Sequence, residues 1–190
     1  MIAVLVIDMQ NAYFEDPALK GGRQEEIVPA CNSLTSAALQ AGTKVILVGT
    51  VHERDKSTWS LNMLDDDQGF IFRGGSEQAE FVPGLLTADL PRLIKTRDSA
   101  FFGTDLAMRL RNWGGVDTVI LAGISAHNCI AQTAADAFAH NIKVIYAAEA
   151  IGTENAEAAE SVLRVLTREY RQNVLPLNEI RQLLGSAPSA

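Results

Sequence analysis

Short runs of apolar residues recur along the chain, and amphipathic stretches with a helical period lie between them. The runs are rich in valine, isoleucine and leucine. Near-continuous apolar runs are typical of strands that are buried on both faces, and therefore of a parallel sheet. The runs predict strands at residues 2–7, 44–48, 92–95, 118–122 and 143–147, with a weaker edge strand at 173–175.

Between the strands, apolar side chains recur every three or four residues, which is the spacing of one face of a helix. This pattern predicts helices at residues 24–40, 104–113, 128–140 and 154–170. Strands that alternate with helices favour an α/β fold, here a single doubly wound domain with a parallel sheet. We expect this domain to span residues 1–184, and the small, polar residues 185–190 to form a flexible tail.

Residues 50–90 depart from this alternation because they show no clear period. Loops of this length in compact domains are usually functional or mobile. We interpret the region as a lid or an interface excursion that contains one or two short helices.

The composition of the chain argues against two classes of binding partner, nucleic acids and membranes. The chain has 190 residues, a formal net charge of −7 and no long basic run, so a nucleic acid is a poor partner. No apolar stretch approaches the ~20 residues that span a bilayer, which predicts no membrane association. Residues 1–8 are interpreted as a buried strand rather than a signal peptide. Only two cysteines are present, which favours free thiols in the reducing cytoplasm.

Three chemically active side chains follow the ends of predicted strands: Asp8, Lys95 and Cys129. Ligands of open parallel sheets bind beyond these carboxyl ends, so we expect the three to share one edge of the sheet. Cys129 falls in the first turn of a predicted helix, where the helix dipole and Lys95 favour a thiolate. Asp8 is placed to take the thiol proton, and the set therefore predicts a cysteine nucleophile. Taken singly, each residue has an ordinary interpretation as a core cysteine, a turn cap or a surface charge.

The other cysteine, two of the histidines and a glycine-rich sequence are not predicted to take part in catalysis. Cys31 lies in the middle of a helix without suitably spaced charged neighbours, so we expect it in the core. His127 is two residues from Cys129, a spacing that does not place two side chains together on a helix. His52 follows a strand but has no second nearby histidine, so no metal site is predicted. The Gly-Gly-Ser sequence at 74–76 lacks the lysine of a phosphate-binding loop.

Several segments, in the same order, resemble the isochorismatase-like cysteine hydrolases. The sequence Ile-Asp-Met-Gln-Asn at 7–11 is similar to that family's opening strand and aspartate. Residues 95–106 resemble its lysine segment, with Lys-x-x-x-Ser-x-Phe followed by Thr-x-Leu. The sequence Gly-Ile-Ser-Ala-His-Asn-Cys at 123–129 resembles the turn that carries its nucleophile. With Glu-Phe-Val-Pro at 80–83, the resemblance extends from residue 1 to about residue 175.

The resemblance implies a parallel sheet of about six strands with helices on both faces, in a homodimer or homotetramer. It implies Asp8 as general base, Lys95 as the group that tunes and orients, and Cys129 as nucleophile, with no cofactor. It also implies a cis peptide bond between Ile124 and Ser125. The backbone amides of Ser125 and Cys129 then form the oxyanion hole.

The resemblance further implies that the substrate is a small amide, ureido or carbamoyl compound. Its C–N bond is cleaved through a thioester intermediate. Loop position alone nominates the substrate-binding residues, which are Asn11, Arg54, Trp59, Phe101 and Asn128.

Departures from the family's pattern leave the substrate open. The turn reads Ser-Ala-His-Asn at 125–128, where the family commonly has Thr-Asn or Thr-Asp. Thr-Val-His at 50–52 lacks the aspartate of a nicotinamidase metal site, which disfavours that activity. Two alternatives remain: a vinyl-ether hydrolase of the isochorismatase kind, which does not need the thiol, and a non-catalytic binding protein on the same fold.

Overall fold

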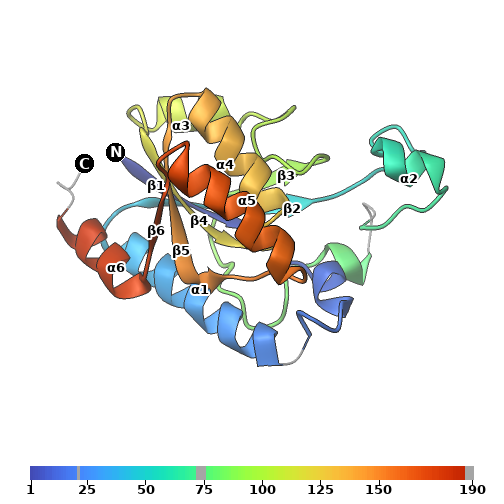
Figure 1. Ribbon diagram of the computed structural model, residues 1–190, viewed down its shortest axis with the longest axis horizontal. Helices are drawn as coiled ribbons and strands as arrows, with labels where there is room; N and C mark the ends of the chain where they lie inside the picture. The colour runs from blue at the N-terminus through green and yellow to red at the C-terminus, as the bar shows by residue number, and fades with distance from the viewer. Residues whose placement is uncertain (21, 72–75, 187–190) are drawn as a thin grey trace.

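The computed structural model describes residues 1–20, 22–71 and 76–186. Within them, six strands form one parallel sheet in the order β3-β2-β1-β4-β5-β6 (Figure 1). The strands are β1 (Ile2–Ile7), β2 (Lys44–Thr50), β3 (Arg92–Lys95), β4 (Thr118–Gly123), β5 (Lys143–Ile151) and β6 (Asn173–Leu175). The predicted α/β class and all six predicted strands are confirmed, although β2 and β5 extend further than the apolar runs indicated.

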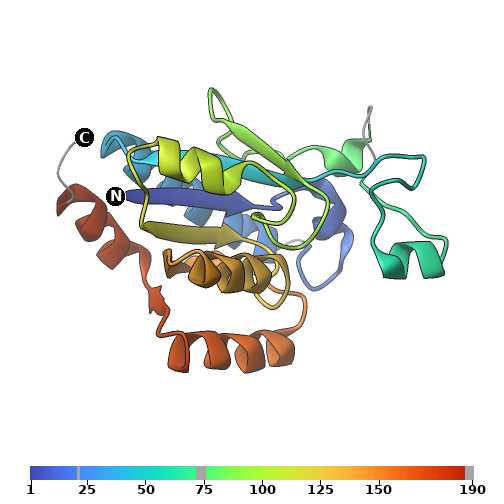
Figure 2. The same ribbon diagram turned by 90° about the horizontal axis from the view of Figure 1, so that it is seen from above.

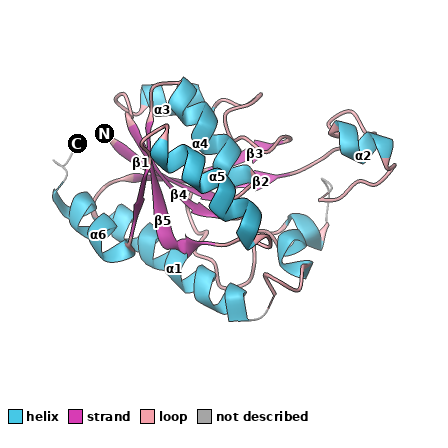
Figure 3. Cartoon of the chain, in the orientation of Figure 1, coloured by secondary structure: helices cyan, strands magenta, loops and turns pink. Residues whose placement is uncertain are grey.

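Helices cover both faces of the sheet (Figures 1 and 3). One face is covered by α1 (Gly22–Gln40) and α6 (Leu177–Ser186), and the other by α3 (Leu106–Asn112), α4 (Cys129–Ala139) and α5 (Ala156–Arg168). In β1, Val4 and Val6 point into the first layer, while Ala3 and Leu5 point into the second. All four are fully buried, as expected for a central parallel strand.

Helix α6 is absent from the sequence-based prediction. Leu177, Ile180 and Leu184 recur at helical spacing and are all buried against the layer that contains α1. The predicted tail is therefore wrong at Gly185 and Ser186, which continue this helix. Residues 187–190 of that prediction lie outside the described residues.

The described residues between β2 and β3, 51–71 and 76–91, form an excursion from the sheet, and its short helices are α2 (Leu61–Asp65) and η2 (Glu77–Ala79). Both views place α2 well away from the sheet (Figures 1 and 2). A third short helix, η1 (Asn11–Glu15), follows β1 and packs against η2. In the described part of the chain, no helix has the length and apolarity needed to cross a membrane.

The strand order changes direction at β1, which lies between β2 and β4. Such a topological switch point opens a crevice beyond the carboxyl ends of the strands. Gly123 ends β4 there with φ 110°, and an added Cβ would lie 1.9 Å from the carbonyl oxygen of Ile7. Glycine at this position therefore allows the segment that leads into α4 to pass close beside the end of β1.

Candidate active site

Asp8 directly follows β1 and is fully buried. Its backbone adopts the left-handed conformation with φ 53°, which aspartate tolerates better than most residues. The amide of Asp8 donates to the carbonyl of Val48 at 2.8 Å, and its Oδ1 accepts from the Thr50 hydroxyl at 3.1 Å. Its Oδ2 has no directed hydrogen bond and lies 2.7 Å from Lys95 Nζ, so this contact is an ion pair.

Lys95 ends β3 and is only 1% exposed. Its Nζ donates to the Thr50 hydroxyl at 2.7 Å and to Cys129 Sγ at 3.4 Å. Burial alone would lower the pKa of this ammonium, but the charges of Asp8 and Cys129 outweigh burial, so the pKa is raised. Lys95 is therefore held as a cation between the carboxylate and the thiol.

Cys129 is the first residue of α4 and is buried. Burial raises the pKa of its thiol well above the ordinary value, and the nearby Asp8 carboxylate raises it further, while Lys95 lowers it. Desolvation and the like charge of Asp8 thus oppose the thiolate that Lys95 and the helix dipole favour. The resting side chain is a thiol, so an attack by sulfur requires a proton acceptor.

The peptide bond between Ile124 and Ser125 is cis, as the sequence resemblance implied. The Ser125 hydroxyl donates to the Glu154 carboxylate. His127 also approaches Glu154, at 3.5 Å from Nε2, and its Nδ1 lies 2.9 Å from the Thr153 hydroxyl. The turn before Cys129 is thus tied to the segment that follows β5.

Three residues at the site were not singled out by sequence reasoning. Thr50 contacts both Asp8 and Lys95. Tyr13, in η1, has a phenol pKa that burial raises well above its ordinary value and that Asp8 and Cys129 raise further. Asp98 places Oδ1 at 3.9 Å from the thiol sulfur. Thr50 and Asp98 lie at or just after the ends of strands, so their positions in the sequence could have identified them as candidates.

Of the nominated substrate-binding residues, Asn128 immediately precedes Cys129 and is exposed. Arg54 is exposed and lies on the excursion. Asn11 instead donates to the carbonyl of Glu77 at 2.8 Å, and so joins η1 to η2. The structure therefore places one of these three beside the nucleophile.

The two nominated aromatic residues take structural places. Trp59 is buried and its indole donates to the carbonyl of Glu53 at 2.9 Å. Phe101 stacks on His140, with ring centroids 5.0 Å apart. His140 caps the end of α4 opposite to Cys129, which is roughly 16 Å away along the helix at 1.5 Å per residue. The ring contact thus places Phe101 toward the far end of α4 from the thiol.

His52 is buried with Nδ1 at 3.0 Å from the carbonyl of Thr58, and burial lowers the pKa of its imidazole. Among the described residues, no three His, Cys, Asp or Glu side chains are grouped to hold a metal ion. Of the Gly-Gly-Ser sequence that was tested as a phosphate loop, residues 74 and 75 lie outside the described part of the chain.

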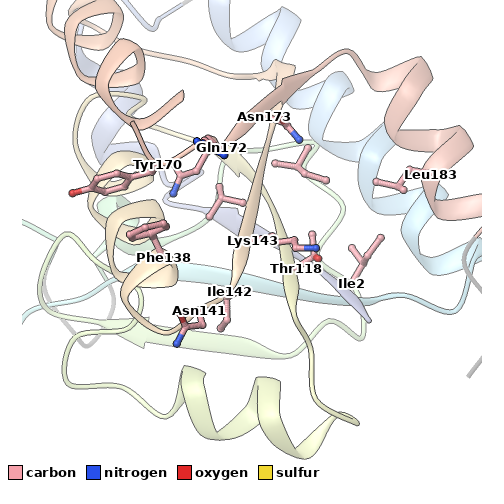
Figure 4. A pocket seen from close by; sticks show the side chains of 13 residues that line it. Ile2, Thr118, Phe138, Asn141, Ile142, Lys143, Tyr170, Gln172, Asn173 and Leu183 are labelled. Atoms are coloured by element: carbon pink, nitrogen blue, oxygen red, sulfur yellow. The ribbon is translucent and has the colours of Figure 1, made fainter. Parts of the chain in front are cut away.

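A cavity of about 600 Å³ lies at the opposite edge of the sheet (Figure 4). Its walls include Ile2, Thr118 and Lys143, which begin β1, β4 and β5, and the stacked rings of Phe138 and Tyr170. A smaller cavity of about 320 Å³ lies beside Asp98 and the first turns of α4. The smaller cavity is lined by Asp98, whose carboxylate contacts the thiol.

Comparison with known proteins identifies the family to which this chain belongs. The family model of the isochorismatase domain matches residues 2–175. The chain is 37% identical over 169 residues to a probable inactive nicotinamidase of Arabidopsis thaliana, covering 83% of this chain and 84% of that protein. It is 30% identical over 165 residues to the N-carbamoylsarcosine amidase of an Arthrobacter species, covering 79% and 59%.

A solved structure agrees with these sequence matches. The isochorismatase family protein of Desulfovibrio vulgaris superposes with a TM-score of 0.80 and 31% identity. The superposition covers 96% of this chain and 97% of that protein. Fold and sequence therefore point to one family.

Proposed function

The chain belongs to the isochorismatase family of hydrolases, and from that premise we propose that it is a cysteine amidohydrolase that cleaves the C–N bond of a small amide, ureido or carbamoyl compound. One observation carries this proposal: Asp8, Lys95 and Cys129 converge from three strand ends into one contact set. Lys95 Nζ lies 2.7 Å from the carboxylate and 3.4 Å from the sulfur. A nucleophile, a proton acceptor and an orienting cation are the parts that such chemistry requires.

The reaction begins with proton transfer from Cys129 to Asp8. The thiol has a raised pKa and therefore needs a base. The Asp8 carboxylate lies close enough to the thiol to raise its pKa, and each carboxylate oxygen has more than one lone pair, so Asp8 can accept that proton while paired with Lys95. Lys95 keeps both groups in place and offsets the negative charge that develops on sulfur.

Sulfur then forms a bond to the carbonyl carbon, and the carbonyl electron pair moves to oxygen. The C–N bond breaks as the oxyanion collapses, and the leaving nitrogen takes the proton from Asp8. A water molecule next attacks the thioester, with its proton passing to Asp8, and the C–S bond breaks. The proton returns to sulfur, which restores the thiol and releases the acid product.

The oxyanion is assigned to the backbone amides of Ser125 and Cys129. The first amides of a helix have no partner within the helix, and their dipoles favour a negative charge. Cys129 begins α4, and the cis peptide bond precedes Ser125. Glu154 binds the Ser125 hydroxyl and so supports this turn.

A second candidate is a vinyl-ether hydrolase of the isochorismatase kind, which is favoured by the family alone. Acid-catalysed cleavage of an enol ether needs no sulfur nucleophile. A vinyl-ether reaction therefore gives no role to the contact between the thiol and the Lys95 ammonium, which also pairs with Asp8. The amide reaction uses all three side chains.

The proposal is tested by ammonia release from a panel of small amides, ureido compounds and carbamoyl compounds. Wild type and Cys129→Ala are compared, with Cys31→Ala as the matched control for loss of a buried thiol. Release by wild type and the control, but not by Cys129→Ala, supports the thiol reaction. Equal release by Cys129→Ala refutes it, and cleavage of a vinyl ether by that variant favours the second candidate.

A further inference from the structure

A second carboxylate lies beside the nucleophile. Asp98 follows β3 by three residues, and its Oδ1 is 3.9 Å from Cys129 Sγ. Unlike Asp8, Asp98 is exposed to solvent. Among the described residues, the thiol is the only polar group found in contact with this carboxylate. Asp98 therefore links the buried thiol to the solvent-exposed surface beside it.

The charges directly beside the thiol do not balance. Asp8 and Asp98 supply two negative charges, whereas Lys95 is the cation that contacts the sulfur. The neighbouring guanidinium of Arg97 is turned to the carbonyls of Thr58, Trp59 and Thr96. Its hydrogen bonds go to these carbonyls, and among the described residues it forms no ion pair with either carboxylate.

The other ionisable groups near the turn leave this imbalance in place. His127 is paired with the Glu154 carboxylate at 3.5 Å. Burial lowers the pKa of His52, which keeps that imidazole neutral at neutral pH. Ionisation of the thiol would therefore add a negative charge to sulfur, which already lies beside two carboxylates and contacts one cation.

The cavity beside Asp98 has the same sign of charge. Its walls are formed by Arg97, Asp98, Ser99, Phe102, Gln132 and Asp136. Gln132 and Asp136 follow Cys129 at three and seven positions along α4, so all three lie on one face of the helix. The walls of the cavity therefore carry two carboxylates, one guanidinium and the exposed ring of Phe102, and Asp98 joins this cavity to the thiol.

We propose that Asp98 is a specificity residue that binds an ammonium group of the substrate, so that the preferred substrate is a small amide carrying an amino group. This inference rests on the function proposed above and names its substrate class. Attack places the carbonyl carbon about 3–3.5 Å from sulfur. A charged amino group two or three bonds further on then lies within hydrogen-bonding reach of Asp98.

Such a substrate brings the missing positive charge with it. The ammonium offsets Asp98 when the complex forms, and so favours loss of the thiol proton only when a substrate is present. An amide that carries a carboxylate meets Asp98 and Asp136 instead and is repelled. The arrangement therefore selects by charge rather than by size alone.

The first test uses reagents rather than substrates, in a Cys31→Ala background so that Cys129 is the thiol observed. Cationic 2-aminoethyl methanethiosulfonate and anionic 2-sulfonatoethyl methanethiosulfonate are compared for their rates of reaction, each divided by its rate with free cysteine. We expect the cationic reagent to be favoured about tenfold or more. Asp98→Asn lowers that preference severalfold. Glu160→Gln, which changes an exposed carboxylate on α5, leaves the preference unchanged. No preference, or one that survives Asp98→Asn, overturns the proposal.

The second test compares three amides of similar size: β-alaninamide, butyramide and succinamate, which are cationic, neutral and anionic. We expect kcat/KM to fall in that order in wild type, by about tenfold at each step. Asp98→Asn removes most of the advantage of β-alaninamide over butyramide, measured as the ratio of their kcat/KM values. A preference for succinamate overturns the inference while leaving the amidohydrolase intact. If the wild type cleaves none of the amides but still reacts faster with the cationic reagent, the proposed amidohydrolase function is refuted, while cation binding at Asp98 is retained.

Discussion

The two cysteines occupy opposite faces of the same sheet and share one property, which is burial. Cys31 is fully buried on α1, where its Sγ donates to the carbonyl of Ala150 at 3.5 Å. Burial raises the pKa of its thiol to about 12. Cys129 is buried on the other face, but it contacts an ammonium and lies close to two carboxylates.

The comparison shows that burial and a raised pKa do not by themselves mark a nucleophile. Desolvation is the largest cause of the shift at both thiols. What differs is the partner: Cys31 meets a backbone carbonyl, whereas Cys129 belongs to a set with a proton acceptor and a cation. The variants below are designed to break or sharpen this contrast, from the largest expected effect to the smallest.

Removal of the two thiols should separate activity from packing. Cys129→Ala is expected to lower kcat of amide hydrolysis by about 10⁴-fold or more, because no nucleophile remains to form the thioester. Cys31→Ala should keep the wild-type kcat. Steady-state ammonia release measures both, and an equal loss in the two variants contradicts the contrast.

Lys95→Met should be strongly destabilising, since it leaves the buried Asp8 carboxylate without its cation. Breaking a buried ion pair costs about 3–5 kcal/mol of the free energy of unfolding. Asp8→Asn combined with Lys95→Met should recover much of that loss, because neither charge remains. Urea unfolding of the single and double variants measures the recovery. Additive losses in the double variant would show that the pair is not coupled.

Glu154→Gln should weaken the turn that leads to Cys129 without removing a reacting group. The amide can still accept from the Ser125 hydroxyl, but the pairing with His127 loses its charge. We expect kcat to fall by about tenfold, with a smaller change in KM, since the oxyanion amides act in the transition state. A change in KM alone would instead assign Glu154 to ground-state binding.

The smallest effect concerns the pH dependence of stability at Cys31. Its folded-state pKa is raised, so its thiol stays protonated in the folded state while the unfolded state ionises above about pH 9. Stability should therefore be unaffected below that value and fall as the pH rises, by about 1 kcal/mol between pH 9 and 10. Urea unfolding of wild type and Cys31→Ala at both values gives the difference. Identical slopes would contradict the assigned burial effect.

Much of the fold could be predicted because buried parallel strands leave a strong pattern. The apolar run at 2–7 and its equivalents predicted every strand, since strands covered on both faces admit few polar residues. Helix α6 was missed although Leu177, Ile180 and Leu184 have helical spacing. Its apolar stripe is short and follows directly on a weak edge strand, so the two patterns overlap.

The candidate site was predictable only in part. The sequence pointed to Asp8, Lys95 and Cys129, because residues at the ends of parallel strands share an edge of the sheet. It did not predict the raised pKa of the thiol, which depends on how completely tertiary packing removes water. Nor could loop position tell that Phe101 stacks on His140, since side-chain direction is decided by packing.

The central claim is that Cys129 carries the acyl group of the substrate during turnover. Acid quenching of a reaction with a cleaved amide, followed by peptide mass analysis, tests this directly. The account predicts an adduct with the mass of the acyl group on the peptide that contains Cys129, and none on the peptide that contains Cys31. Continued turnover by Cys129→Ala, with no adduct on Cys129 in wild type, would contradict it.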